Sequence, residues 1–178
     1  RRVGDGFDLV RDLLDLAAAQ RPIDEETGES VALGRTLEKA VEVARERARG
    51  KGIGFEGRLP GPDVTVHGQP GDIERIVTNL LDNAIKYTPP GGQVRFSVSA
   101  DDSTVRVEVA DTGIGIDPSE QPRVFEGFYR TAAAKASSEV GTGLGLSIVQ
   151  RLLDRWNGKL ELESSPGQGS RFVITFPR

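Results

Sequence analysis

Hydrophobic residues recur along the chain at two spacings, one typical of helices and the other of strands. The clearest helical pattern covers residues 72–87, where apolar residues recur at positions i, i+3, i+4 and i+7 of a helix: Ile73, Ile76, Val77, Leu80, Leu81, Ala84 and Ile85. Asp72 can cap the start of this helix, and the Pro-Pro-Gly-Gly run at 89–92 ends it. We therefore predict a helix over residues 72–87 with one buried face.

Weaker patterns of the same two kinds predict the rest of the fold. Helical spacing is found over residues 7–19, 33–49, 118–129 and 144–156. Alternation of apolar and polar residues predicts one hairpin at 94–98 and 105–109, a second at 159–164 and 171–176, and short strands near 53–56 and 64–66. Helices combined with antiparallel hairpins indicate an α+β fold, a two-layer sandwich of helices on one face of a mostly antiparallel mixed sheet.

Two polar segments break this pattern. Residues 21–30 contain Pro22 and Gly28 and read as a linker, so we place a domain boundary there. Residues 1–30 would then hold the end of an amphipathic helix and the linker, and residues 31–178 the main domain. Residues 131–140 are rich in Ala and Ser and offer little apolar area, which predicts a mobile segment.

Composition excludes several classes of function. The chain has 178 residues, 37% of them hydrophobic, which suffices for a buried core. A net charge of −4 and the absence of a long Lys/Arg tract argue against a nucleic-acid partner. The chain has no cysteine and a single histidine, His67, so it cannot by itself build a cysteine-ligated or multi-histidine metal site. It also lacks methionine, and we expect it to be a piece of a longer protein.

A polar stripe borders the apolar face of the helix predicted over residues 72–87. At about 100° per residue, Asn79, Asn83 and Lys86 fall side by side on this stripe. Carboxamide oxygens are ligands suited to Mg²⁺, and a lysine one turn further along can meet phosphate oxygens. The same three residues are also compatible with an ordinary solvated helix face.

Two glycine-containing segments could bind the rest of a nucleotide. Asp111-Thr-Gly-Ile-Gly follows a predicted strand, where the carboxylate can accept a hydrogen bond from an exocyclic amine, although an ordinary turn has the same composition. Gly141-Thr-Gly-Leu-Gly-Leu begins a predicted helix, whose amide groups and dipole suit a polyphosphate. This second segment is not a P-loop, because no Lys-Ser/Thr pair follows it. It is not a Rossmann dinucleotide-binding motif either, because no βαβ unit surrounds it.

Taken together and in this order, the motifs resemble those of the ATP-binding catalytic domain of sensor histidine kinases, within the wider superfamily (GHKL) of gyrase, Hsp90 and MutL. The resemblance covers about residues 31–178. Asn79–Pro89 looks like the N box of this family, Asp111–Gly115 its G1 box, Val124–Arg130 its F box and Gly141–Gly145 its G2 box. It implies the Bergerat ATP-binding fold, ATP and Mg²⁺ as ligands, and a flexible lid over residues 131–140.

The resemblance also implies roles for individual residues. Asn79 and Lys86 would contact the phosphates and Arg130 the γ-phosphate, and these three form the implied catalytic set. Asn83 would bind Mg²⁺, Tyr87 would pack on adenine, and Asp111 would accept its amine. The remaining implied ATP-binding residues are Gly113, Gly115, Ile116, Phe125, Gly141, Thr142, Gly143, Leu144, Gly145 and Leu146. Two positions depart from the family pattern: Gly127 stands where Arg is frequent, and Val140 where a glycine often precedes the G2 box.

The implied reaction is transfer of the ATP γ-phosphoryl group to a histidine on a dimerisation helix, and then to an aspartate of a response regulator. Residues 1–30 would be the end of that dimerisation hairpin, with the acceptor histidine upstream, because no histidine precedes His67. His67 lies outside every motif and is interpreted as incidental. Gyrase and Hsp90 relatives carry a basic glutamate where this chain has Asn79, and a carboxamide cannot take a proton from water, which favours a kinase over a hydrolase.

The resemblance further implies partners and a location. These are the upstream dimerisation domain with its dimer mate and a cognate response regulator, in a membrane-associated full-length homodimer whose catalytic domain is cytoplasmic. Two alternatives stay open. One is an anti-sigma-factor-like serine kinase, against which the amphipathic segment at residues 7–19 argues. The other is a nucleotide-binding scaffold without kinase activity.

Overall fold

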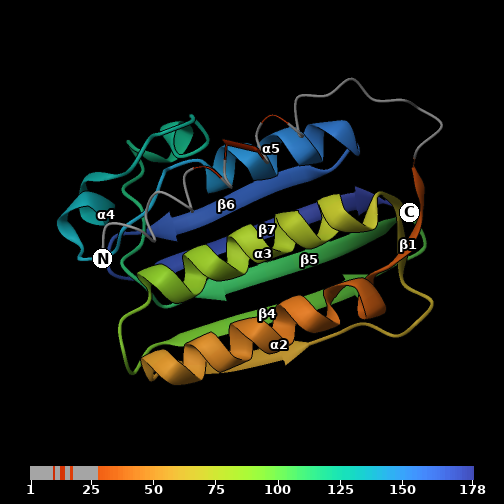
Figure 1. Cartoon of the computed structure of the whole chain (residues 1–178), viewed down its shortest axis with the longest axis horizontal. Coiled ribbons are helices and arrows are strands. Elements are labelled where there is room, and N and C mark those ends of the chain that lie inside the picture. Colours follow the sequence, from red (N-terminus) through yellow and green to blue (C-terminus); the bar gives the residue numbers. More distant parts are fainter. Residues whose placement is uncertain (1–9, 11–12, 15–16, 18–27) are drawn as a thin grey trace.

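The computed structural model describes residues 10, 13–14, 17 and 28–178, and these residues form two layers (Figure 1). Helices α2, α3 and α5 lie side by side over one face of the larger sheet. The elements in chain order are β1 (Glu29–Ala32), α2 (Leu33–Lys51), β2 (Gly54–Arg58), β3 (Thr65–Gly68), α3 (Pro70–Tyr87), β4 (Gln93–Ala100), β5 (Thr104–Asp111), the 3₁₀ helix η2 (Gln121–Arg123), α4 (Ala132–Ala136), α5 (Gly145–Arg155), β6 (Lys159–Ser165) and β7 (Gly169–Pro177). The predicted α+β sandwich is confirmed.

The larger sheet has five strands in the order β2-β4-β5-β7-β6. The pair β2–β4 is parallel and the other three pairs are antiparallel, so the sheet is mixed, as expected. Strand β5 lies in the centre, and its last residue, Asp111, is opposite Val94 on one side and Ser170 on the other. The sheet register therefore places the Asp111 carboxylate between two strands rather than at an open edge.

Helix α3 lies between α2 and α5 and buries the face that its sequence predicts. All seven of its predicted apolar residues are at most 6% exposed: Ile73, Ile76, Val77, Leu80, Leu81, Ala84 and Ile85. Alternate residues of β4, β5 and β7, among them Phe96, Val107 and Ile174, pack against this layer. Each fully buried side chain of this size contributes about 1.5–3 kcal/mol through removal of apolar area from water. The rotation of α3 is thereby fixed, and its polar stripe has to lie beside the core.

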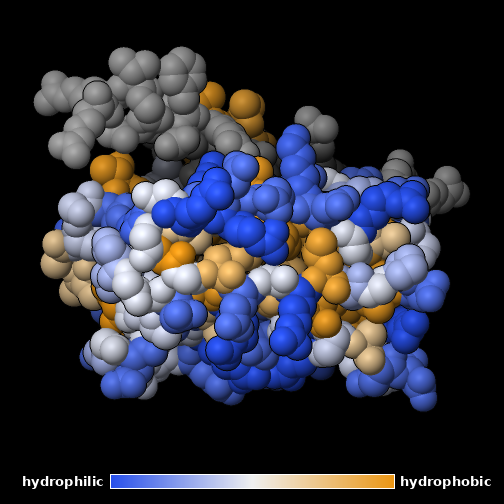
Figure 2. All heavy atoms as spheres, turned by 90° about the horizontal axis from the view of Figure 1, so that it is seen from below, coloured by the Kyte–Doolittle hydropathy of each residue, from blue (hydrophilic) through white to orange (hydrophobic). Residues whose placement is uncertain are grey.

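The outer face of helix α2 is polar, in contrast to the apolar face that α3 buries. Its exposed residues are mainly charged, and Figure 2, a view of the edge formed by α2 and β2, shows hydrophilic side chains over most of this surface. Its C-terminus is closed by Gly52 at φ 71°, whose amide donates to the carbonyl groups of Ala48 and Arg49. Lys51, the last residue of α2, is partly exposed, and its ammonium reaches the end of α3, where it donates to the carbonyl oxygens of Ile85 and Lys86.

Asp72 does not cap α3, contrary to the prediction. The N-cap is Gln69, and Pro70 occupies the first turn. The Asp72 carboxylate instead accepts hydrogen bonds from the Trp156 indole at 2.8 Å and from the Arg155 guanidinium at 3.1 Å. It joins the start of α3 to the end of α5, a contact between residues more than 80 positions apart that no local rule predicts.

The prediction of a helix over residues 118–129 is also wrong. Only the three-residue η2 forms there, flanked by turns, and Phe128 has a positive φ of 65°. Pro118, Pro122 and Gly127 interrupt the segment. The helix appears slightly later, as α4, where the Thr131 hydroxyl caps the chain by accepting the Ala134 amide at 3.1 Å. The segment predicted to be mobile thus contains a short helix.

The N-terminal predictions are only partly covered. Most of residues 7–19 and 21–27 lie outside the described residues, but Val10, Leu13, Leu14 and Ala17 are helical and exposed. Residues 29–30, predicted to belong to the linker, are instead part of β1, which pairs antiparallel with β3. The boundary after residue 30 stays a prediction. Within the described part of the chain, no helix has the length and apolarity needed to cross a bilayer.

Candidate functional site

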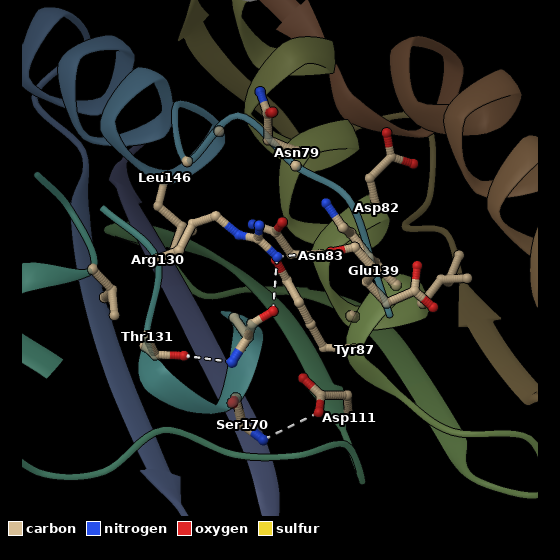
Figure 3. Close-up of a pocket in the computed structure, with 18 of the residues that line it drawn as sticks. Asn79, Asp82, Asn83, Tyr87, Asp111, Arg130, Thr131, Glu139, Leu146 and Ser170 are labelled. Carbon is tan, nitrogen blue, oxygen red and sulfur yellow. Dashed lines mark hydrogen bonds between the residues drawn. The ribbon is translucent and has the colours of Figure 1, made fainter. Parts of the chain in front are cut away.

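A cavity of about 590 Å³ opens beside α3, within the size range of about 300–1,000 Å³ typical of small-molecule sites. Its walls come from α3, the end of β5 with the loop that follows, and the segment from residue 129 to the start of α5. Figure 3 shows these parts converging, with the Arg130 side chain extending across the space between them. The cavity thus brings together motifs that are up to 67 positions apart in the chain, from Asn79 to Leu146.

Helix α3 contributes its polar stripe to this cavity. Asn79, Asn83 and Lys86 line it, as the helical spacing predicts, and so does Tyr87, which the family resemblance implied. The Asn79 amide donates to the Arg75 carbonyl at 2.9 Å, which fixes the orientation of its carboxamide. Added Cβ atoms at two glycines facing this stripe would come within 2.1 Å of Lys86 Nζ and 3.0 Å of Asn79 Oδ1, at Gly141 and Gly145 respectively. Glycine at these positions allows the loop to approach α3 this closely.

Asp111 forms the opposite end of the cavity. Its Oδ1 accepts hydrogen bonds from the amides of Gly113 at 2.7 Å and Ser170 at 3.3 Å (Figure 3). Within the described part of the chain its Oδ2 has no hydrogen bond. Burial raises the pKa of the Asp111 carboxyl to about 6, and the two amide hydrogen bonds oppose that rise. A half-buried carboxylate with one oxygen available is suited to accept a hydrogen bond from an amine of a ligand.

Arg130 carries an unsatisfied donor on the cavity wall. Its Nη2 donates to the carbonyl oxygens of Ala134 and Glu139, both at 2.7 Å. Its Nε is buried and has no hydrogen-bond partner within the described residues. A buried donor without a partner costs about 1–3 kcal/mol, so an anion reaching this atom would bind favourably.

The charged residues around the cavity are mostly cations. The lining includes five basic residues, Arg47, Lys51, Arg75, Lys86 and Arg130, and three acidic ones, Asp82, Asp111 and Glu139. Two of the acids are already paired: Asp82 lies 2.5 Å from Arg47, and Glu139 lies 2.7 Å from Lys51. The excess of positive charge favours an anionic ligand such as a polyphosphate.

The structure brings most of the predicted site residues together. Thirteen of them line the cavity: Asn79, Asn83, Lys86, Tyr87, Asp111, Gly115, Ile116, Arg130, Gly141, Thr142, Gly143, Gly145 and Leu146. Three do not. Leu144 is fully buried in the core, where it is the N-cap residue of α5, and the Gly113 amide is turned toward Asp111. Phe125, in the turns after η2, lies outside the lining.

Sequence reasoning missed the part of the wall that comes from outside the motifs. Arg47 and Lys51 lie one turn apart at the end of α2, and Ser170 lies on β7 opposite Asp111. The spacing of Arg47 and Lys51 was the available signal, but a basic last turn is common in helices and indicates only a favourable interaction with the dipole. Their role depends on how α2 packs on α3.

Comparison with known proteins agrees with the motifs. Residues 68–178 match the family described as histidine kinase-, DNA gyrase B-, and HSP90-like ATPase. The chain is 36% identical to the phosphate regulon sensor protein PhoR of Pseudomonas aeruginosa, over 99% of this chain and 40% of that protein. It is 34% identical to the sensor histidine kinase RppB of Synechocystis sp., over 95% of this chain and 37% of that protein. The chain therefore spans about two fifths of the length of these relatives.

Solved structures show the same likeness. Full-length ShkA in complex with AMPPNP superposes with a TM-score of 0.82 and 34% identity, over 99% of this chain and 37% of that one. The mycobacterial sensor histidine kinase MprB superposes with a TM-score of 0.72 and 31% identity, over 84% of this chain and 97% of that one. The fold of residues 28–178 is thus the one found in these kinases.

Proposed function

This chain belongs to the family of histidine kinase-, DNA gyrase B- and HSP90-like ATPases, and we propose that residues 31–178 are the catalytic ATP-binding domain of a sensor histidine kinase. The resemblance expected from the motifs is confirmed by relatives and solved structures that are sensor histidine kinases. The proposed reaction transfers the γ-phosphoryl group of ATP to a histidine of a dimerisation helix, for onward transfer to an aspartate of a response regulator.

The observation that carries this proposal is the chemical asymmetry of the cavity. One end holds a half-buried carboxylate, Asp111, and the other holds basic side chains with the unpaired Nε of Arg130. ATP has the matching asymmetry, with an amine donor on adenine and negative charge on the phosphates. We assign Asp111 to the adenine amine and Tyr87 to packing on the ring. Asn79, Lys86 and Arg130 are assigned to the phosphates, together with backbone amides of the loop 141–145.

Mg²⁺ fits the same end of the cavity. We assign its protein ligand to the carboxamide oxygen of Asn83, a neutral oxygen donor of the type that Mg²⁺ accepts alongside phosphate oxygens. When bound, the ion would neutralise part of the phosphate charge. Asn83, one helical turn from Asn79 and close to Lys86, would hold and orient the ion.

The side chains described on the wall formed by α3 favour phosphoryl transfer over hydrolysis. Asn79 cannot accept a proton from water at neutral pH. The carboxylates of Asp82 and Glu139 are held in ion pairs with Arg47 and Lys51. The described residues that line the cavity would therefore position the γ-phosphoryl group and stabilise its charge. The group would persist until a histidine nucleophile arrives.

Calorimetric titration with a non-hydrolysable ATP analogue tests the binding site. Asn83→Ala removes the assigned metal ligand and Asp111→Ala the adenine acceptor, and each is expected to weaken binding in Mg²⁺ by about 1–3 kcal/mol. Asp117→Ala, an exposed acid in the same loop that does not line the cavity, is the matched control. Native affinity in both site variants would refute the assignment.

Phosphoryl transfer is tested with a separately supplied dimerisation hairpin that carries an acceptor histidine. The chain should label the hairpin from radiolabelled ATP, and the label should be lost in acid and stable in base, as expected of phosphohistidine. Acid-stable label on the chain itself would indicate a serine or threonine kinase. ATP binding without any transfer would indicate a nucleotide-binding scaffold.

The proposal extends to the whole protein. The named relatives are sensor proteins more than twice as long as this chain. Following the resemblance to sensor histidine kinases, we propose a full-length, membrane-associated homodimer in which the catalytic domain is cytoplasmic and serves its dimer mate and a response regulator. Cross-linking of the full-length protein in cells, followed by membrane fractionation, tests both statements.

A further inference from the structure

Lys51 joins parts of the cavity wall that are distant in the sequence. Its ammonium donates to the carbonyl oxygens of Ile85, at 3.1 Å, and Lys86, both in the last turn of α3. It also lies 2.7 Å from Oε1 of Glu139, just before the glycine-rich loop. An ammonium group has three N–H donors, so these contacts use all of them. Lys51 thus caps α3 and at the same time holds Glu139 at the cavity.

Glu139 engages two cations of the cavity, one through its side chain and one through its backbone. Its carboxylate pairs with Lys51, and its carbonyl oxygen accepts from Arg130 at 2.7 Å. Figure 3 shows Glu139 beside Asn83, near the end of the Arg130 side chain. An acidic residue therefore lies beside Asn83 and Arg130, where the phosphates of a nucleotide are assigned, and its carboxylate neutralises Lys51.

We propose that Glu139 is an internal counter-anion, whose carboxylate competes with nucleotide phosphates for Lys51 and sets how the site discriminates nucleotides by phosphate charge. This inference rests on the nucleotide-binding function proposed above. A polyphosphate entering the cavity is repelled by the carboxylate of Glu139 and attracted by Lys51 and Arg130. It binds best when residue 139 moves away, which leaves Lys51 as an additional phosphate ligand from outside the family motifs.

The segment that carries Glu139 can move at small cost. Its neighbour Val140 is 62% exposed, and Ser138 is exposed as well. The Lys51–Glu139 ion pair is itself partly solvated, with side chains 27% and 34% exposed, and such pairs contribute little to stability. Few buried apolar contacts and a weak ion pair are the conditions under which a segment opens locally.

Glu139→Gln is the deciding variant, because it removes the charge but leaves every contact between Lys51 and α3 in place. We expect it to bind a triphosphate analogue about fivefold more tightly than the native chain, since the competing ion pair and the repulsion are both lost. Affinity for adenosine, which carries no phosphate, should stay unchanged. The gain should shrink at high salt, because screening weakens the repulsion that the substitution removes.

The control is Glu161→Gln, an exposed glutamate on β6 that does not line the cavity. It makes the same change in net charge and should leave the affinity for both ligands unchanged. Native binding of the triphosphate establishes the proposed function independently of this inference. An unchanged or weaker triphosphate affinity in Glu139→Gln, or an equal gain for adenosine, would overturn the role of Glu139 and leave the nucleotide site intact.

Discussion

Replacing Asp111 by asparagine tests whether the site retains an unfavourable buried charge. Burial raises the pKa of the Asp111 carboxyl from 3.8 to about 6, and the amides of Gly113 and Ser170 offset only part of this rise. Near neutral pH the folded protein therefore holds a carboxylate that is better solvated in the unfolded chain. A site selected for stability alone would not keep such a charge, whereas one that accepts a hydrogen bond from a ligand requires an acceptor there.

The sign and size of the effect follow from proton binding. Between about pH 4 and pH 6 the folded state binds more protons at Asp111 than the unfolded state, so the free energy of unfolding falls as pH rises. The difference in pKa corresponds to at most about 3 kcal/mol, at about 1.4 kcal/mol per pKa unit. Asparagine has no charge to bury and can still accept the Gly113 amide. We expect Asp111→Asn to be about 1–3 kcal/mol more stable than the native chain at about pH 8, and about equal at about pH 4.

Urea unfolding followed by the fluorescence of Trp156 measures this difference, because the chain has one tryptophan and it is buried. The control is Asp117→Asn in the same loop. Hydrogen bonds from the hydroxyl and amide of Ser119 lower the pKa of Asp117, so neutralising it should destabilise the fold at high pH, opposite to the Asp111 variant. If Asp111→Asn unfolds at a lower urea concentration than the native chain at about pH 8, with an unchanged slope, the argument from burial is refuted.

Three further outcomes are expected. Affinity for the ATP analogue should fall as pH drops below about 6, because protonation of Asp111 removes its negative charge and turns one of its two acceptor oxygens into a donor. Titration at several pH values checks this, and a flat profile in the Asp111→Asn variant is the control. Gly169→Ala should destabilise the fold by more than about 2 kcal/mol, because φ is 86° there and a Cβ would lie 1.9 Å from the Asp111 carbonyl oxygen. The control is Gly50→Ala in α2, where a Cβ meets open space and the substitution should be neutral or stabilising. Thermal unfolding of both variants measures the difference. Asn79→Glu introduces a base and should raise steady-state ATP hydrolysis measured by phosphate release. A rate equal to that of Asn79→Gln would contradict the inference that a base at position 79 decides between transfer and hydrolysis.

The spacing of apolar residues was sufficient to predict those helices and strands in which it is periodic. The buried face of α3 and the two hairpins could be predicted because a continuous apolar stripe admits one rotation of a helix and one face of a strand. The same rotation places Asn79, Asn83 and Lys86 on one side, so the wall that α3 contributes to the cavity was predictable as well. Where the signal was not periodic, as over residues 118–129, the interpretation failed: prolines and a glycine leave only a 3₁₀ helix there.

Other features depend on contacts between segments that are far apart in the chain, and no local rule contains them. The sequence by itself determined the order of the motifs, the apolar faces and the polar stripe of α3, because each is a property of neighbouring residues. Tertiary packing decided that Asp72 binds Trp156 instead of capping its own helix, and that sheet register buries Asp111 beside Ser170 and raises its pKa. It also decided that Lys51 reaches across to Glu139, because both the solvation of a charge and the identity of its partner are set by what packs around it.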